Sequence, residues 1–291
     1  MLEMKIIATD MDGTLLNNEE EVSKENAAAI KKAQEQGIEV IVATGRGYIA
    51  AAEPLAKAGL KIPVIGLNGG EIRTAEGELL DSVPLGNDLY LKIQQACQKQ
   101  DIYFEVFTNH GTYTDNLDRS IQAMIEIVSS TNVNYDEEKI RSHVMHRVEV
   151  GRLKTIESYD HLFDLPDIEF YKVLTFSRIE EKLRNVGGEL EGENDLSITA
   201  SARDNLEINH INAQKGIALE KFAKERGVDM KDVMALGDNF NDVSMLRIAG
   251  RSVAMENAEQ EIKDICHFVT KKNIEHGVGH AIEQLLKDLV K

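Results

Sequence analysis

Apolar and polar residues alternate along the first part of the chain in blocks of strand and helix length. Short apolar runs of the kind that form buried parallel strands are separated by amphipathic stretches of helical spacing. Ser23 is a good N-cap for the first of these helices, and Gly37 is expected to end it. The predicted elements are strands over 6–9, 38–43 and 64–66 and helices over 23–36 and 48–58. This order predicts a parallel, doubly wound sheet with right-handed crossovers.

The pattern becomes irregular after residue 70, where hairpins and helices mix. The predicted elements there are a hairpin over 71–83, helices over 87–99, 120–128 and 178–186, strands over 102–107, 112–114, 167–177, 196–200 and 206–208, and a polar loop over 187–194. Regular alternation resumes with strands over 233–236 and 252–254 and helices over 216–226, 242–249, 258–266 and from about 278. We therefore predict an α/β core of residues 1–83 and 209–291 that carries an inserted α+β cap, residues 84–208.

Composition is that of an ordinary globular protein, with an acidic balance. Of the 291 residues, 42% are hydrophobic, and 33 Lys and Arg stand against 50 Asp and Glu, for a formal net charge of −17. Such a surface argues against nucleic acid or an anionic membrane as partner, because both require a basic footprint. The sequence shows no cleavable leader and no apolar run of membrane-spanning length, which predicts a cytoplasmic protein. Cys97 and Cys266 lack metal-ligand spacing and are expected to be reduced and buried.

Polar residues with chemical potential gather where the predicted core strands end. They are Asp10-x-Asp12-x-Thr14, Thr44-Gly45-Arg46, Lys215 at a helix start, and Gly237-Asp238-Asn-Phe-Asn241-Asp242. A parallel sheet collects such strand ends at one edge, so these groups can converge. Two acids as close as Asp10 and Asp12 require Mg²⁺ or a shared proton. Carboxylates, a hydroxyl, backbone amides and a cation together suit the transfer of a phosphoryl group.

These four segments resemble the motifs of haloacid dehalogenase superfamily phosphatases, specifically the Cof-type branch with an inserted α/β cap. DMDGTLL, VATGR, KG and GDNFND occur in the family's order, and the resemblance covers essentially the whole chain. It implies that Asp10 is a nucleophile that forms an aspartyl-phosphate, and that Asp12 is first a general acid and then a general base. It also implies Mg²⁺ bound by the Asp10 and Asp238 carboxylates and the Asp12 carbonyl oxygen. The implied phosphoryl-binding groups are the Met11 amide, Thr44, Gly45, Lys215 and Asn241, with Asp242 ordering metal-bound water or Lys215.

Structural alternatives exist for several of these residues. Thr44 and Asn241 could each serve only as a helix cap, and Lys215 could be an ordinary surface residue of its helix. His276 and His280 have helical spacing for zinc, but glycines separate them and no third ligand is apparent. For this histidine pair we predict a loop followed by a helix start.

The leading functional hypothesis is a Mg²⁺-dependent phosphatase of small phosphorylated metabolites. The resemblance indicates sugar phosphates or a phosphorylated ribitylamino-pyrimidine of flavin synthesis as substrates, selected by the cap, where Arg203 in the 197–207 hairpin is one candidate contact. Two alternatives stay open: a sugar phosphomutase, and a sugar-phosphate-binding regulator that has lost turnover. Phosphate release from p-nitrophenyl phosphate would separate the three. The sequence does not indicate an oligomeric state.

Overall fold

The computed structural model describes residues 4–131, 135–200 and 204–289 and divides the chain into two compact units. Unit 1 comprises Met1–Ser82 and Asn212–Lys291, and unit 2 comprises Val83–Ile211. Unit 2 begins one residue before the predicted insertion and ends three residues after it. Arg203, the candidate cap contact, lies outside the described residues.

The sheet of unit 1 has the strand order β14-β13-β12-β1-β2-β3-β4-β5. Neighbours from β14 to β3 pair in parallel, and β4 and β5 are added antiparallel. The strands are β1 (Ile6–Thr9), β2 (Glu39–Ala43), β3 (Val64–Gly66), β4 (Glu71–Arg73), β5 (Leu79–Ser82), β12 (Val233–Gly237), β13 (Arg251–Ala254) and β14 (Phe268–Val269). The order runs outward in both directions from β1, so the predicted doubly wound α/β fold class is confirmed.

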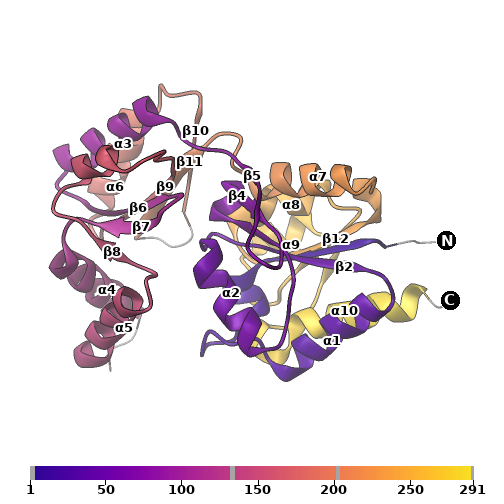
Figure 1. Cartoon of the computed structure of the whole chain (residues 1–291). Helices are drawn as coiled ribbons and strands as arrows, with labels where there is room; N and C mark the ends of the chain where they lie inside the picture. The colour runs from indigo at the N-terminus through magenta and orange to yellow at the C-terminus, as the bar shows by residue number, and fades with distance from the viewer. Residues whose placement is uncertain (1–3, 132–134, 201–203, 290–291) are drawn as a thin grey trace. The chain divides into compact units, whose positions relative to one another are not determined.

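Helices cover both faces of this sheet because its strands are apolar on both sides. In β1, Ile7 packs into the core on one face, whereas Ile6 and Ala8 pack into the core on the other. The first face is covered by α1 (Lys24–Glu35), α2 (Tyr48–Lys57) and α10 (Gly277–Leu289), and the second by α7 (Lys215–Glu225), α8 (Val243–Ile248) and α9 (Gln260–Ile265). Helices α1 and α10 lie side by side (Figure 1). Short turns complete the unit: a π-helical turn over Met11–Leu15 and 3₁₀ turns over Leu67–Gly69, Met230–Asp232, Phe240–Asp242 and Asn273–Glu275.

Local signals at helix ends account for several of these boundaries. The Ser23 hydroxyl accepts a hydrogen bond from the Asn26 amide at 3.2 Å and caps α1 as predicted. Gly37 follows the end of α1 with φ of 80°. His276 closes the 3₁₀ turn before α10, so the predicted loop and helix start are confirmed for the histidine pair.

Unit 2 is built on a six-stranded sheet of order β10-β11-β9-β6-β7-β8. Its strands are β6 (Tyr103–Thr108), β7 (Gly111–Thr114), β8 (Lys154–Thr155), β9 (Phe170–Phe176), β10 (Leu196–Thr199) and β11 (Asn205–His210). Helices α3 (Asn87–Lys99) and α6 (Glu180–Leu190) and a 3₁₀ turn (Tyr159–Asp164) contribute to its main apolar core. Helices α4 (Leu117–Thr131) and α5 (Glu137–Glu149) pack against each other (Figure 1).

The predicted polar loop over 187–194 is wrong at its start. Helix α6 continues through Gly187 and Gly188 to Leu190. Glycine costs a helix about 1 kcal/mol relative to alanine. Leu183, Val186 and Leu190 are buried on one side of α6 in the apolar core, and this packing outweighs the cost. Helix α5 was not predicted, because Ile140 and Val144 are its buried residues and give a weak periodic signal.

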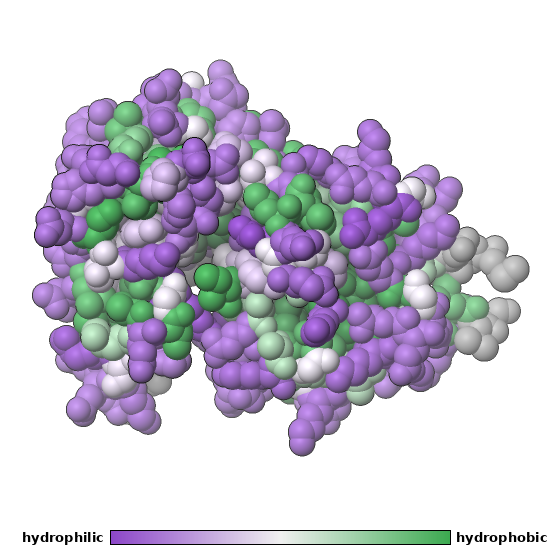
Figure 2. All heavy atoms as spheres, in the orientation of Figure 1, coloured by the Kyte–Doolittle hydropathy of each residue, from purple (hydrophilic) through white to green (hydrophobic). Residues whose placement is uncertain are grey.

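Hydrophilic side chains cover most of the surface of each unit in the view of Figure 2. In the part of the chain that the structure describes, no helix has both the length and the apolar character that crossing a membrane requires. Cys97 is buried and Cys266 is half-buried. Burial raises the pKa of the Cys97 thiol to about 12 and that of Cys266 to about 11, so both are protonated at neutral pH.

Candidate active site

The predicted site residues of unit 1 lie where neighbouring strands of its sheet end. Asp10 directly follows β1, Thr44 follows β2 and Asp238 follows β12, while Lys215 is the first residue of α7. Strands β12, β1 and β2 are adjacent and parallel, so their carboxyl ends meet at one edge. One carboxylate oxygen each from Asp10, Asp238 and Asp242 lies within 4.8 Å of the others.

Lys215 is the cation of this carboxylate cluster. Its side chain is 0% exposed, and Nζ donates hydrogen bonds of 2.6 Å to Asp10 Oδ1 and of 2.6 Å to Asp242 Oδ1. Burial alone would lower the pKa of Lys215, but the two carboxylates outweigh it and hold the pKa above its usual value. The lysine is therefore charged, and the alternative of an ordinary surface residue is excluded.

The cluster brings three carboxyl groups to one ammonium group. Burial raises the pKa of Asp10 well above its usual value; Lys215 opposes this shift, and neighbouring carboxylates add to it. Burial and the Asp242 carboxylate raise the pKa of Asp238 to about 7. Three carboxylates around one ammonium group thus lack a compensating charge. Such an all-oxygen donor set fits a hard divalent cation.

Asp242 supports the loop that follows β12. Its Oδ2 atom accepts hydrogen bonds from the backbone amides of Asp238 at 2.9 Å and Asn239 at 3.0 Å, while Oδ1 is bonded to Lys215. This close approach requires glycine at position 237, because a Cβ there would overlap the Asp242 side chain. Both Asp242 oxygens are therefore engaged by the protein itself, which leaves Asp10 and Asp238 as the carboxylates better placed to bind a metal.

The turn after Asp10 lies directly against Asp238. Thr14 Oγ1 donates a hydrogen bond of 2.8 Å to Asp238 Oδ1. Gly13 has φ of 77°, and a Cβ at this position would overlap Asp238 Oδ2. The Asp-x-Asp-Gly-Thr sequence thus brings the backbone of the first motif against the carboxylate of the last one.

The Asp12 carboxylate points to a different partner. Its side chain is 56% exposed, and the Arg46 guanidinium reaches both oxygens, with Nε at 3.1 and 2.9 Å and Nη2 at 2.5 Å from Oδ1. Arg46 Nη2 also lies 3.3 Å from Glu20 Oε2. The carboxylate of Asp12 is therefore not a member of the cluster that Asp10, Asp238 and Asp242 form.

The remaining predicted residues line the same edge. Thr44 is buried, and its hydroxyl accepts a hydrogen bond from the Arg46 amide at 3.1 Å. Asn241 Nδ2 donates to Asn68 Oδ1 at 3.3 Å, and the buried Oδ1 of Asn241 has no hydrogen-bond partner among the described residues. The N-caps here are Gly47 for α2, Asn239 for the 3₁₀ turn and Asp242 for α8, so capping does not account for Thr44 or Asn241. Gly45 lies in the segment between β2 and α2, and the Met11 amide belongs to the π-helical turn that follows β1.

Comparison with known proteins identifies the family. Residues 7–282 match the haloacid dehalogenase-like hydrolases. The chain belongs to this family. It is 36% identical over 285 residues to the phosphatase YwpJ of Bacillus subtilis, covering 97% of this chain and 100% of that protein. It is also 36% identical over 284 residues to the 5-amino-6-(5-phospho-D-ribitylamino)uracil phosphatase YwtE of the same organism, covering 97% and 98%.

A solved structure of a haloacid dehalogenase-like hydrolase from B. subtilis shares the fold of this hydrolase. The TM-score is 0.87 at 36% sequence identity, and the match covers 97% of this chain and 100% of the other. The predicted superfamily and the predicted enzyme class are confirmed by these matches.

Two polar residues at this edge of the hydrolase had no role in the sequence-based prediction. Arg46 stood in the second motif without a partner, and Asn68 stood in a segment predicted only as a turn. Asn68 adopts φ of 60° in the 3₁₀ turn that follows β3, and its backbone amide donates to the Thr44 carbonyl at 2.9 Å. The usable signal was their position, since each lies within three residues of the carboxyl end of a strand of the parallel sheet.

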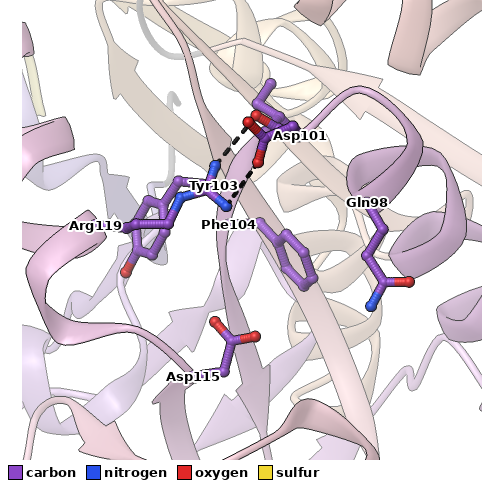
Figure 3. A pocket seen from close by; sticks show the side chains of 7 residues that line it. Gln98, Asp101, Tyr103, Phe104, Asp115 and Arg119 are labelled. Carbon is purple, nitrogen blue, oxygen red and sulfur yellow. Dashed lines mark hydrogen bonds and ion pairs between the residues drawn. The ribbon is translucent and has the colours of Figure 1, made fainter.

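Unit 2 has a pocket of its own. It has a volume of about 150 Å³, and the side chains around it include Tyr103, Asp115 and Arg119 (Figure 3). Arg119 extends to Asp101, with Nη1 at 3.0 Å from Oδ1. The Asp101 side chain is 80% exposed, so this ion pair is weak. None of the described residues that line the pocket is a predicted site residue.

Proposed function

We propose that this hydrolase is a Mg²⁺-dependent phosphatase that hydrolyses small phosphorylated metabolites through an aspartyl-phosphate on Asp10. The observation that supports it most is the buried Asp10 carboxylate, bonded to Lys215 Nζ at 2.6 Å within a cluster of acids. A carboxylate is a poor nucleophile towards a phosphate dianion because the two repel each other. The cluster supplies the cationic surroundings that reduce this repulsion only when a metal ion joins Lys215.

The ion would be held by the Asp10 and Asp238 carboxylates and the Asp12 main-chain carbonyl. These are oxygen donors, which Mg²⁺ prefers. When bound, Mg²⁺ neutralises charge on the phosphoryl oxygens and on the attacking carboxylate.

The residues of the chain bind and orient the phosphoryl group. The ammonium of Lys215, fixed between Asp10 and Asp242, places a positive charge next to the attacking oxygen. Thr44, Asn241 and the amides of Met11 and Gly45 are the proposed donors to the remaining phosphoryl oxygens. Preorganised donors of this kind stabilise charge that develops in the transition state.

Asp12 is the proposed proton carrier. In the first step a bond forms between an Asp10 oxygen and phosphorus, the ester P–O bond breaks, and Asp12 gives its proton to the leaving oxygen. In the second step water attacks phosphorus and gives a proton back to Asp12, and phosphate leaves while the Asp10 carboxylate is restored. The guanidinium of Arg46 fixes the position of the Asp12 carboxylate between turnovers.

Unit 2 is the proposed substrate-specificity cap. The groups described in unit 1 act on the phosphoryl portion, which all phosphomonoesters share, so they do not distinguish leaving groups. Two relatives, YwtE and YcsE of B. subtilis, are named for 5-amino-6-(5-phospho-D-ribitylamino)uracil. We propose this compound and sugar phosphates as the first substrates to assay.

Asp10→Asn tests the proposed nucleophile. The amide is isosteric with the carboxylate but a very poor nucleophile, so kcat for p-nitrophenyl phosphate should fall by several orders of magnitude while the fold is kept. Mass spectrometry must exclude deamidation back to Asp. Retention of more than about a tenth of wild-type kcat would show that Asp10 is not the nucleophile.

The wild-type enzyme decides between phosphatase and the alternatives. Sustained phosphate release in the presence of Mg²⁺ supports the phosphatase. Dependence on a bisphosphate activator would favour the phosphomutase, and complete absence of turnover would favour the regulator.

A further inference from the structure

Three asparagine side chains bind main-chain carbonyls in the turn that follows Asp10. Asn257 Nδ2 donates to the Gly13 carbonyl at 2.8 Å, Asn26 Nδ2 to the Leu15 carbonyl at 3.1 Å, and Asn273 Nδ2 to the Leu16 carbonyl at 2.9 Å. Asn26 is fully buried in α1, whereas Asn257 and Asn273 come from the C-terminal part of the chain. None of the three belongs to the four sequence motifs.

Asn257 and Asn273 are joined to each other. Asn257 Oδ1 accepts a hydrogen bond from the backbone amide of Asn273 at 2.9 Å. A side-chain amide carries donors and an acceptor, so Asn257 binds Gly13 with one end and Asn273 with the other. We call this pair the asparagine strap. It spans the turn from the Gly13 carbonyl to the Leu16 carbonyl.

The turn depends on such external bonds because its own conformation is irregular. Within the single π-helical turn, Asp12 has ψ of 120° and Gly13 has φ of 77°, both outside helical values. The main-chain bonds that close the turn run from Leu15 to Asp10 at 3.3 Å and from Leu16 to Met11 at 2.9 Å. Neither of these two hydrogen bonds involves the main chain of Asp12 or Gly13.

The strap acts on the point where this turn meets Asp238. On one side, Gly13 lies against the Asp238 carboxylate, and Thr14 is bonded to it at 2.8 Å. On the other side, Asn257 holds the Gly13 carbonyl. Gly13 is thus fixed from both directions, and it directly follows Asp12.

We propose that Asn257 and Asn273 are positioning residues of this enzyme, which fix the Asp12–Gly13 backbone relative to Asp238 for metal binding and phosphoryl transfer. This inference rests on the proposed function, because it assigns the Asp12 carbonyl and the Asp238 carboxylate to one ion. Residues that hold metal ligands in place commonly change metal affinity or activity by about 10- to 100-fold when they are substituted.

The test is Asn257→Ala, which removes the bonds to Gly13 and Asn273 together. Two readouts are needed: the Kd of Mg²⁺ alone by titration calorimetry without substrate, and kcat and KM for p-nitrophenyl phosphate. We expect the Kd of Mg²⁺ to rise about tenfold and kcat to fall about tenfold, with KM within about twofold. Asn273→Ala keeps its backbone bond to Asn257, so its effects should have the same sign and be smaller.

Asn109 in unit 2 provides a matched control. Its Nδ2 donates to the Asp167 carbonyl at 2.7 Å and its Oδ1 accepts from the Glu169 amide at 3.0 Å, the same two-ended pattern. Asn109→Ala therefore removes equivalent hydrogen bonds. Its Tm should fall about as much as that of Asn257→Ala, whereas Mg²⁺ affinity and kcat should stay at wild-type values.

Three results would overturn the inference. One is an Asn257→Ala enzyme whose Mg²⁺ Kd and kcat stay within about twofold of wild type. Another is an equal loss in Asn109→Ala, which would indicate a general effect of destabilisation. If Asn257→Ala does not fold, Asn273→Ala is judged by the same two readouts, and its failure to change either is the third.

The metal titration also separates this inference from the proposed function. A wild-type protein without phosphatase activity would refute the proposed function. The strap would still stand if Mg²⁺ affinity fell in Asn257→Ala, and it would fail if that affinity did not change.

Discussion

Substitution of Lys215 by Met is the most informative single change in this protein. Methionine has similar length but no charge, so the two hydrogen bonds to Asp10 and Asp242 are lost and the buried carboxylates face each other without a cation. Removing one partner of a buried ion pair typically costs about 3–5 kcal/mol. A domain is stable by about 5–15 kcal/mol in total, so this loss is a large share.

The same substitution should impair catalysis by a separate mechanism. Loss of one preorganised donor to developing charge typically costs about 2.7–4 kcal/mol in the transition state, or about 10²–10³ in kcat. Mg²⁺ can replace part of the missing positive charge in the resting protein. At a concentration about 100 times its Kd, a ligand stabilises the folded state by about 2.7 kcal/mol. We therefore expect Mg²⁺ at that concentration to raise the free energy of unfolding of Lys215→Met by about 2.7 kcal/mol, between about half and nine-tenths of the lost stability, without restoring kcat.

The assays are urea unfolding at pH 8, in excess EDTA and in saturating Mg²⁺, and phosphate release from p-nitrophenyl phosphate. Lys231→Met is the control, since Lys231 is an exposed lysine of unit 1 whose ion pair with Asp229 is open to solvent. It should change neither quantity measurably. The reasoning is refuted if Lys215→Met keeps more than about a tenth of kcat, or if its unfolding free energy in EDTA equals that of wild type.

Three further predictions concern the turn after Asp10, the metal ion and unit 2. Gly13→Ala should lower kcat by about tenfold or more, because the new Cβ overlaps Asp238 Oδ2. Gly37→Ala is the control: Gly37 also has a positive φ, of 80°, but open space surrounds it, so the substitution should lower only the stability of the protein. Equal activity of the two variants would contradict this prediction. Phosphatase activity should require Mg²⁺ and should be inhibited by Ca²⁺, since Ca²⁺ accepts more ligands at longer distances and can occupy both Asp10 oxygens. Full activity in excess EDTA would exclude the metal mechanism. Ser197→Leu and Thr199→Leu in β10 should change kcat/KM unequally across phosphorylated metabolites, and an equal fall for every substrate would argue against unit 2 as the specificity cap.

The arrangement of the core was predictable because few alternatives satisfy the sequence. Apolar runs of strand length alternate with amphipathic helices, and parallel strands with right-handed crossovers then place Asp10, Thr44 and Asp238 at one edge. Unit 2 was harder to predict, because tertiary packing overrides local propensity there. Gly187 and Gly188 would end most helices, but the buried side of α6 holds them in one.

Specific side-chain partners were beyond the sequence. The ion pair of Arg46 with Asp12 and the bonds of Asn257 to Gly13 join residues far apart along the chain. Their existence depends on the rotamers and loop conformations that the whole fold selects, and an arginine or asparagine in a loop has many possible partners. The buried pair of Lys172 with Glu207 in unit 2, with 2.7 Å between Nζ and Oε2, was missed for the same reason.

The charge of the cluster bears on one function that the sequence left open, the metal-free binding of a sugar phosphate. A protein that only bound a sugar phosphate without metal would place the phosphate dianion beside Asp10, Asp238 and Asp242, where Lys215 is the cation bonded to the cluster. Like charges in a buried site repel strongly, and the pKa values of Asp10 and Asp238 are raised by burial first and by neighbouring carboxylates second. A divalent cation reduces the repulsion among the carboxylates, because it stabilises their ionised form. It also reduces the repulsion between the carboxylates and the phosphate dianion, because it attracts the dianion. The arrangement therefore suits metal-dependent phosphoryl transfer better than metal-free binding, and phosphate should bind weakly in excess EDTA and measurably in Mg²⁺.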